Sequence, residues 1–403
     1  MGYHLHLWWG TTQRARGAVV GIDAGNVDVR VVIARMDAEG AIAPDAAVPV
    51  LGAGVVPAQG LSRGMVTDPR RLGAAIRTAV AQAERAAGHH VLGAYFSVPL
   101  SQCRGAAHGE RPTRIVLSSP VAVRDVSLHA AEHAAIWHEV ARHAGLEVVG
   151  IVPSALAASA AVVLPEEHEQ GAIVVECGAE HTSVAVFSGG TVQLLGTIPV
   201  GGDHITRDLA SVLGIDPLEA ERLKFEIGNA RTGMPSVDIL VRGQDGQRTA
   251  VSVALIAAIV SARVDQMLGH VGEMVRPVAS AARSGRGRDG GVGGLGQVVL
   301  CGGGAALSGL APMTRAALGM PVRIAGAWGF AGPAAVQSPA YASVLGLLRW
   351  RAMVQPPVEQ RGLSTELRNP GARFPMANLP ELAGQPNRIG QTRWQAWLRE
   401  FLP

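Results

Sequence analysis

One short pattern of residues occurs twice in this chain, and it limits the possible folds more than any other feature. The first copy contains Ile22-Asp23-Ala24-Gly25, and the second contains Val175-Glu176-Cys177-Gly178. In both copies the acidic residue and the glycine stand between two apolar runs, which predicts a β-hairpin with a tight turn. An internal repeat constrains the fold more strongly than any single predicted helix or strand, so we interpret it first. Taken alone, the two hairpins are equally compatible with an ordinary α/β domain.

The two predicted turns have the chemistry of a phosphate site. A turn built from Gly and Ala exposes backbone N–H groups in a concave loop, which suits phosphate oxygens. A carboxylate just before the turn, here Asp23 or Glu176, can orient the waters of Mg²⁺, which needs few protein ligands. Two such turns that face each other would hold a triphosphate from both sides.

The composition excludes several classes of protein. A length of 403 residues allows two or three domains, and a net charge of +3 is too small to indicate a nucleic-acid partner. Three cysteines without a CxxC spacing are typical of a reduced compartment and do not indicate structural zinc. No segment has the features of a signal peptide, and the longest uncharged run, 148–164, is interrupted by Pro153. We therefore expect the protein to stay in the cytoplasm.

Several segments have clear strand or helix patterns. Pro69 begins a predicted helix that ends at Ala87, before Gly88. The stretch Val251–Val275 has the pattern of a long amphipathic helix. The other predicted elements are strands near 48–56, 93–98, 115–117, 148–152 and 298–300, a helix from Ser154 to near Pro165, and a helix near 309–318.

Four histidines lie in a predicted helical stretch at 125–144. His129 and His133 stand four residues apart and could hold a metal on one helix face. The zinc-protease pattern HExxH fails because residue 142 is Arg. We interpret this stretch as the solvated face of an alanine-rich helix.

Two further glycine clusters stand next to predicted helices. Gly201 and Gly202 precede a helix from Thr206 and would offer free N–H groups beside a helix dipole. Cys301-Gly302-Gly303-Gly304 follows a strand and precedes a helix, so its backbone could approach a flat or phosphorylated ligand. The GxGxxG matches within 283–296 follow no predicted strand, and we expect a flexible loop there.

Lys224 is the only lysine of the chain and stands three residues after Glu221. The two side chains therefore share one face of a predicted helix. One interpretation is an ion pair within the helix. The other is a carboxylate and an ammonium group that line an adenosine pocket.

The C-terminal part of the chain has a different pattern. Prolines recur between 355 and 387 without periodicity, which predicts a disordered linker. In 388–403 the apolar residues follow helical spacing, with arginines available for anionic lipid headgroups. We expect this amphipathic helix to bind the membrane surface through Arg393, Trp394, Trp397, Leu398, Arg399 and Phe401.

Taken together, these features resemble the FtsA family of bacterial cell-division proteins, within the actin-like ATPase superfamily. The resemblance covers about 19–349 and the tail, and includes Gly64-Met65-Val66-Thr67-Asp68 and the stretches 198–206, 220–228 and 299–305. It implies an α/β, actin-like, two-lobed fold of duplicated RNase H-like domains, with a nucleotide cleft. The implied divisions are a disordered segment at 1–16, a first lobe at 17–95 and 146–200, a shortened inserted subdomain at 96–145, a second lobe at 201–354 with a small subdomain near 228–296, the linker at 355–387 and the helix at 388–403.

The resemblance also implies ligands and partners. These are ATP with Mg²⁺, the C-terminal tail of the tubulin-like protein FtsZ, membrane lipids and further copies of the chain in filaments. The protein would lie at the division septum, on the cytoplasmic face of the inner membrane. Asp23 and Glu176 are the expected metal residues. The expected nucleotide-binding residues are Asp23, Gly25, Asn26, Glu176, Gly178, Ala179, Thr182, Gly201, Gly202, Glu221, Lys224, Gly302, Gly303 and Gly304.

The sequence departs from the family pattern at both phosphate turns. Asn26-Val27-Asp28 replaces small hydroxyl residues and a lysine, and Glu180 replaces a turn glycine. Two unit charges 4 Å apart repel by ~4 kcal/mol at an effective dielectric constant near 20, so an uncompensated Glu180 would weaken polyphosphate binding. No catalytic residue is expected, and the chain would be at most a weak ATPase.

Three functions fit this sequence. The first is an adaptor that tethers FtsZ filaments to the membrane and binds ATP weakly. The second is an actin-like ATPase of another assembly system, of the pilus-assembly type, although Asp28 and Glu180 argue against it. The third is a small-molecule kinase, for which Asp203 is the one candidate general base.

Overall fold

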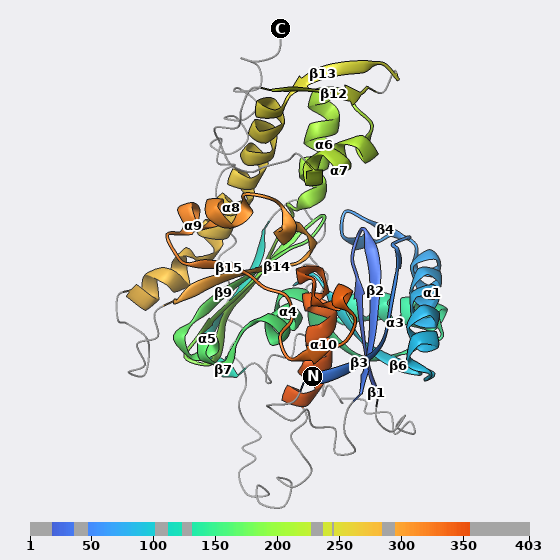
Figure 1. Ribbon diagram of the computed structural model, residues 1–403. Helices are drawn as coiled ribbons and strands as arrows, with labels where there is room; N and C mark the ends of the chain where they lie inside the picture. The colour runs from blue at the N-terminus through green and yellow to red at the C-terminus, as the bar shows by residue number, and fades with distance from the viewer. Residues whose placement is uncertain are drawn as a thin grey trace, which may run out of the picture. The chain divides into compact units, whose positions relative to one another are not determined.

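The computed structural model describes residues 18–35, 47–100, 112–122, 131–226, 237–243, 246–283 and 295–354. These residues form two compact units, which are described separately below (Figure 1). The predicted N-terminal segment, the linker and the membrane-binding helix lie outside the described residues.

Unit 1 is built around a six-stranded sheet with the order β16-β3-β2-β1-β6-β8. Neighbours among β1, β2 and β3 are antiparallel, whereas β6 lies parallel to β1 and β8 lies parallel to β6. The elements of this unit are β1 (Ala18–Ala24), β2 (Asp28–Arg35), β3 (Val48–Pro57), β4 (Leu61–Ser62), β5 (Met65–Val66), α1 (Pro69–Ala87), β6 (Gly93–Val98), α3 (Ala131–Ala144), β8 (Glu147–Pro153), α4 (Ser154–Val162), β16 (Phe330–Ala331), η3 (Ala334–Gln337), η4 (Pro339–Tyr341) and α10 (Ala342–Val354).

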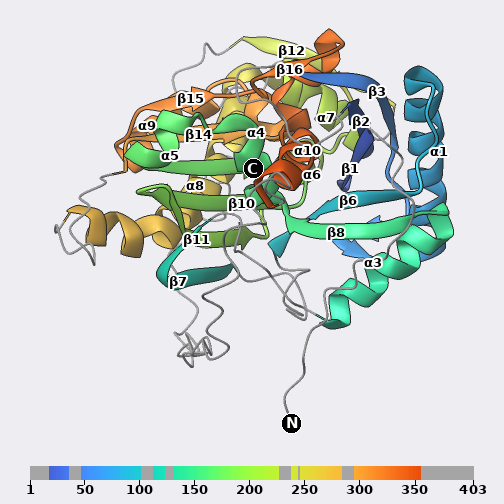
Figure 2. The same ribbon diagram turned by 90° about the horizontal axis from the view of Figure 1, so that it is seen from below.

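Helices cover both faces of this sheet (Figure 2). α1 and α3 lie on one side, and α4 and α10 lie on the other. Glycines permit the close approach. A Cβ atom at Gly54 would stand 2.0 Å from the Ala79 carbonyl oxygen of α1, and one at Gly21 would stand 2.5 Å from the Val344 carbonyl oxygen of α10.

Unit 2 has a six-stranded sheet with the order β15-β14-β9-β10-β11-β7. Its long helix α8 packs on β10 and β11, and buries Ile256, Val260, Val264 and Val271 in the core. The elements of this unit are β7 (Thr113–Ala122), α5 (Pro165–Gln170), β9 (Ala172–Cys177), β10 (Thr182–Ser188), β11 (Thr191–Ile198), α6 (Gly202–Leu213), α7 (Pro217–Glu226), β12 (Asp238–Arg242), β13 (Arg248–Ser252), α8 (Val253–Arg283), β14 (Gln297–Cys301), η2 (Gly303–Ala306), α9 (Leu310–Leu318) and β15 (Val322–Ile324).

The two sheets repeat one topology. β9, β10 and β11 form an antiparallel series like β1, β2 and β3, while β14 and β15 are parallel neighbours of β9, as β6 and β8 are of β1. The predicted hairpins therefore begin two copies of the same α/β unit, each with one further strand beside its third strand. The predicted duplication is confirmed.

The boundaries of the units differ from the predicted lobes. Residues 163–200 lie in unit 2 and residues 326–354 lie in unit 1, because β9 pairs with β14 and α10 packs on α4 and β1. Strand β7, which falls in the predicted inserted subdomain, pairs with β11 of unit 2. Sequence order placed these segments with their neighbours along the chain, whereas strand pairing joins them to more distant segments.

Several predicted elements are confirmed closely. α1 runs from Pro69 to Ala87, with the Asp68 carboxylate accepting from the amides of Arg70 and Arg71 and with Gly88 in the left-handed region. The long helix was predicted two residues too early, since β13 continues to Ser252. α8 is also long and apolar enough to cross a bilayer over 253–280, but its buried side chains make it a core helix of unit 2. Residues 284–294, most of the glycine-rich stretch 283–296, lie outside the described residues.

Candidate functional site

The turns of the two repeated hairpins close in the same way. The Gly25 amide donates to the Asp28 carbonyl at 3.0 Å in unit 1, and the Gly178 amide donates to the His181 carbonyl at 2.9 Å in unit 2. A Cβ atom at Gly178 would stand 2.8 Å from the His181 carbonyl oxygen, which accounts for the glycine. Both copies of the pattern therefore fold into the predicted tight turn.

The second turn packs against the start of α6. The Gly202 amide donates to the Gly178 carbonyl at 2.9 Å, and the Asp203 amide donates to the Ala179 carbonyl at 2.8 Å. The Gly201 amide donates to Nδ1 of His204 at 3.2 Å. The prediction of free N–H groups at Gly201 and Gly202 is therefore wrong, because the hairpin turn and His204 accept these hydrogen bonds.

Two other amides of this turn remain available. Within the described part of the chain, the N–H groups of Ala179 and Glu180 donate to no protein acceptor. The hydroxyl of Thr182 is buried and donates to the Val200 carbonyl at 2.8 Å, so its observed contact ties the hairpin to the segment before α6. A phosphate in this turn would thus meet the amides of Ala179 and Glu180.

Lys224 joins α7 to the start of α6. Its ammonium group is 2.7 and 2.8 Å from the two Glu221 carboxylate oxygens, 3.0 Å from the Thr206 hydroxyl and 3.3 Å from the Gly202 carbonyl oxygen. The lysine side chain is 6% exposed. The interpretation as an ion pair within the helix is confirmed, and the pair also contacts the Gly202 turn and Thr206. The interpretation as an adenosine pocket stays a prediction.

The third glycine cluster packs on the same hairpin. Gly302 has a φ of +82°, and a Cβ atom there would stand 2.5 Å from the Cys177 carbonyl oxygen. A Cβ atom at Gly304 would stand 3.0 Å from the Cys177 Cβ, whereas one at Gly303 would meet nothing within 4 Å. Gly302 and Gly304 are thus required by packing, and exposed Gly303 leaves open space for a ligand.

Both extra acids of the phosphate turns have an arginine partner. Glu180 accepts two hydrogen bonds from Arg207 of α6, at 2.7 and 3.0 Å. In unit 1, Asp28 accepts one from Arg30 at 2.8 Å. The repulsion expected from an uncompensated Glu180 is therefore offset. Arg30 stands two residues after Asp28 on one strand, so the sequence held a signal for that pair, but none for Arg207.

Burial and charge change the protonation of several groups here. Burial alone would raise the pKa of Glu180, but the hydrogen bonds and charge of Arg207 outweigh it and lower that pKa. Burial, followed by the Arg207 charge, lowers the pKa of His204 to about 4. Burial, with a smaller effect of Glu176, raises the pKa of the Cys177 thiol to about 12, and burial likewise raises that of Cys301. The two cysteines are therefore buried neutral thiols and not nucleophiles.

The structure brings together the predicted nucleotide residues of unit 2 through these contacts. The other three predicted nucleotide residues, Asp23, Gly25 and Asn26, belong to unit 1. Burial raises the pKa of Asp23 against the opposing charge of Arg30, and a cation beside this carboxylate would stabilise its charged form. A carboxylate of this kind can orient the waters of Mg²⁺, and the described residues contain no group of three or more metal-binding side chains.

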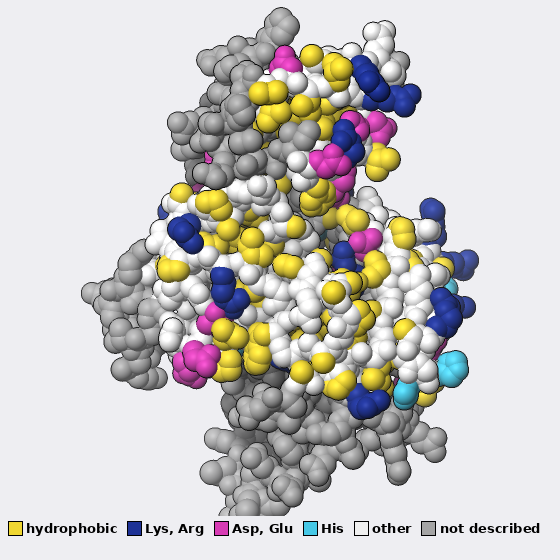
Figure 3. Space-filling view, viewed as in Figure 1, with side chains coloured by type: hydrophobic (Ala, Val, Ile, Leu, Met, Phe, Trp, Pro, Cys, Tyr) yellow, Lys and Arg dark blue, Asp and Glu magenta, His cyan; other side chains and the backbone are white. Residues whose placement is uncertain are grey.

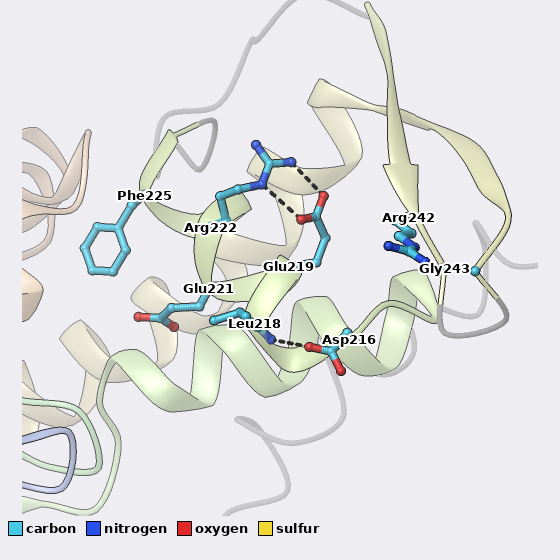
Figure 4. Close-up of a pocket in the computed structure, with 9 residues that line it drawn as sticks. Asp216, Leu218, Glu219, Glu221, Arg222, Phe225, Arg242 and Gly243 are labelled. Carbon is cyan, nitrogen blue, oxygen red and sulfur yellow. Dashed lines mark hydrogen bonds and ion pairs between the residues drawn. The ribbon is translucent and has the colours of Figure 1, made fainter. Parts of the chain in front are cut away.

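A second candidate site is an open hollow of about 790 Å³ beside α7 (Figure 4). α7, the turn before it and the hairpin β12–β13 line this hollow with Asp216, Leu218, Glu219, Glu221, Arg222, Phe225, Arg242, Gly243 and Gly246. Leu218 is 79% exposed and Phe225 is 52% exposed. The role of these two residues was not predictable from the sequence, because exposure of an apolar helix residue depends on tertiary packing.

Exposed apolar side chains gather around this hollow. Among the ten large apolar residues that the described chain exposes, Leu218 and Phe225 lie on α7, and Val237 and Leu240 lie in or just before β12. Figure 3 shows apolar, basic and acidic side chains exposed next to one another at the top of the view, where α7 and β12 lie in Figure 1. Such a concentration of exposed apolar surface marks interaction sites.

Solved structures with the same arrangement define the fold. The PilM–PilN type IV pilus biogenesis complex matches with a TM-score of 0.56 and 17% identity, over 85% of this chain and 100% of that chain. MreB5 of Spiroplasma citri bound to ADP matches with a TM-score of 0.54 and 16% identity, over 83% and 95%. The MamK double helical filament matches with a TM-score of 0.52 and 12% identity, over 82% and 98%. The chain therefore has the actin-like fold.

Sequence relatives give a narrower placement. The family model of cell division protein FtsA matches residues 173–346. Cell division protein FtsA of Escherichia coli strain K12 is 24% identical over 393 residues, covering 83% of this chain and 90% of the relative. FtsA of Rhizobium meliloti strain 1021 is 28% identical over 387 residues, covering 81% and 85%. Within the actin-like fold, this chain is FtsA-like.

Proposed function

We propose that this protein acts in bacterial cell division as an actin-like adaptor, tethering FtsZ filaments to the inner face of the cytoplasmic membrane. The observation that carries this proposal is the similarity to FtsA proteins, which extends over 83% of this chain and 90% of the E. coli relative and so includes both units. The similarity to pilus-assembly PilM is one of fold alone, at 17% identity.

The proposed nucleotide is ATP with Mg²⁺, bound weakly. In unit 2, the amides of Ala179 and Glu180 face the phosphates, and the open backbone at Gly303 faces the nucleoside. Glu221 and Lys224 support the Gly202 turn from behind. An actin-like relative of the same fold holds ADP. In this proposal the output of the protein is binding and assembly, and any ATP turnover is slow.

The FtsZ tail is proposed to bind in the hollow beside α7. Its apolar side chains Leu218 and Phe225 would anchor an apolar segment, and Arg222 and Arg242 would contact acidic or carbonyl groups on the rim. The proposed binding site therefore lies where the small subdomain expected near 228–296 adjoins α7. Helix α8 contributes to the hydrophobic core that also contains Leu223 of α7 and Val241 of β12.

A pair of matched substitutions tests this site. Leu218→Glu should weaken binding of an FtsZ C-terminal peptide at least tenfold, because an exposed apolar anchor becomes charged. Leu92→Glu, at a position of unit 1 that is also exposed, should leave peptide binding unchanged. Fluorescence anisotropy of the labelled peptide gives both values. Equal binding by wild type and Leu218→Glu would remove the hollow from the proposal.

Membrane attachment is proposed to use the C-terminal helix at 388–403. Burial of each large side chain contributes ~1.5–3 kcal/mol and each arginine near an anionic surface adds about 1 kcal/mol, while ordering of the helix offsets much of this. One copy should thus bind weakly and reversibly. Filaments would link several copies, and avidity then raises the affinity by two to four powers of ten.

Substitutions on opposite faces of this helix test the attachment. Trp397→Glu should release the protein from anionic vesicles in a sedimentation assay, whereas Thr392→Glu adds the same charge on the opposite face and should keep most of the binding. The melting temperature should be the same for both variants. Unaltered sedimentation of Trp397→Glu would contradict the tether. A fluorescent fusion lacking 388–403 should likewise lose its septal position in cells.

A further inference from the structure

The contact between Glu180 and Arg207 lies inside the proposed phosphate site and uses residues outside the predicted binding set. Glu180 stands in the turn between β9 and β10, and its own amide and that of Ala179 donate to no protein acceptor among the described residues. Arg207 stands on the second turn of α6, and both of its terminal nitrogens donate to the carboxylate, at 2.7 and 3.0 Å. A guanidinium group is thus paired with a side chain of the turn at which the polyphosphate is proposed to bind.

The two partners differ in burial. The side chain of Glu180 is 9% exposed, whereas that of Arg207 is 51% exposed. The Glu180 carboxylate also lies 4.0 Å from Nδ1 of His204. Arg207 therefore has room to reorient toward a ligand, while Glu180 does not.

A carboxylate and a phosphate compete for the same guanidinium geometry. Both accept two parallel N–H···O bonds from arginine, and phosphate carries the greater charge. The acidic residues Asp203 and Asp208 also lie near enough to Arg207 to raise its pKa after the dominant effect of the Glu180 hydrogen bonds, so its charge is secure. A phosphate that binds Arg207 would therefore have to displace the Glu180 carboxylate.

We propose that Arg207 is a phosphate-binding residue of the nucleotide site. A bound phosphate must replace the Glu180 carboxylate as the partner of Arg207. This inference rests on the proposed nucleotide binding of the preceding subsection. It gives the weak affinity a specific cause, which is the exchange of one charge-assisted pair for another. Under this proposal Glu180 does more than repel the ligand, because its removal would leave Arg207 free to bind the phosphate.

Calorimetric titration with ATP and Mg²⁺ tests the exchange in the full-length protein. Glu180→Gln should tighten ATP binding about tenfold, because Arg207 loses its competing anion. In the Glu180→Gln background, Arg207→Gln should then weaken ATP at least tenfold. Adenosine, which has no phosphate, should bind all variants within about twofold. Arg248→Gln removes the same charge from exposed β13 and should leave ATP binding unchanged.

Each result decides the inference. If Glu180→Gln leaves the ATP affinity unchanged, or if Arg207→Gln has no effect in the Glu180→Gln background, Arg207 is only the counterion of Glu180 and the inference is wrong. If ATP binds the wild type and only these two effects are absent, the proposed nucleotide binding stands without it. If ATP binds none of the variants, while thermal melting shows that all of them are folded, both the nucleotide site and the inference fail.

Discussion

At the scale of single residues, Gly302 and Gly303 differ in whether the fold requires a glycine. Gly302 needs its positive φ and the approach to Cys177, whereas Gly303 meets open space. Gly302→Ala should lower the free energy of unfolding by ~2–4 kcal/mol, because the new Cβ atom collides with a backbone carbonyl at a strained φ. Gly303→Ala should change it by less than ~1 kcal/mol. Urea denaturation measures both, and equal losses would contradict the packing described for Gly302.

His204 makes the stability of unit 2 depend on pH. Its pKa of about 4 in the folded protein lies below the value near 6.5 of an unfolded chain. Between these values the unfolded chain binds a proton that the folded protein does not, so stability falls as the pH is lowered. From pH 7 to pH 5 this residue should contribute a loss of about 1–2 kcal/mol.

A substitution at the same position isolates this effect. Gln at position 204 can still accept from the Gly201 amide without titrating, so His204→Gln should flatten the loss of stability between pH 7 and pH 5. His138→Gln, on an exposed face of α3, should leave the pH dependence unchanged. Urea midpoints at several pH values give the comparison, and an unchanged slope in His204→Gln would rule out His204 as the titrating group.

At the scale of elements, α7 carries two charge networks of different depth. Lys224 is buried against α6, whereas Arg222 forms exposed ion pairs with Glu219 and Glu226 on the same helix. Lys224→Ala should cost about 3 kcal/mol of stability and weaken ATP binding, because Glu221 and Thr206 lose their shared cation beneath the Gly202 turn. Arg222→Ala should leave the unfolding midpoint unchanged. Unchanged stability in Lys224→Ala would contradict the buried network.

The elements also show which predictions the sequence could support. α1 was predicted from Pro69 to Ala87 because its signals are local: Asp68 caps it, Pro69 begins it and Gly88 ends it. The Gly201 amide that was predicted to be free donates to the His204 side chain three residues later. The prediction for the Gly202 amide failed because its acceptor, the Gly178 carbonyl, lies more than twenty residues away. Arg207 was missed for the same reason. Local caps and periodicity are visible in a sequence, whereas partners across a fold are not.

At the scale of the molecule, the repeated hairpin was sufficient to predict the duplicated α/β fold. The limits of the units were not predictable in the same way, because α10 belongs to unit 1 although it follows residues 163–325 of unit 2 in the chain. The strand β7 adds itself to β11 although its sequence neighbours belong to unit 1. A pattern of adjacent residues predicts whether a segment forms a helix or a strand, but not which sheet a strand joins.

The central claim is that one chain joins FtsZ to a membrane, and reconstitution on a supported anionic bilayer tests it directly. Fluorescent FtsZ filaments should accumulate on the bilayer only when the full-length protein is present, and both Trp397→Glu and Leu218→Glu should abolish this accumulation while Thr392→Glu and Leu92→Glu preserve it. Accumulation that is equal with and without the protein, or that survives both Trp397→Glu and Leu218→Glu, would contradict the account.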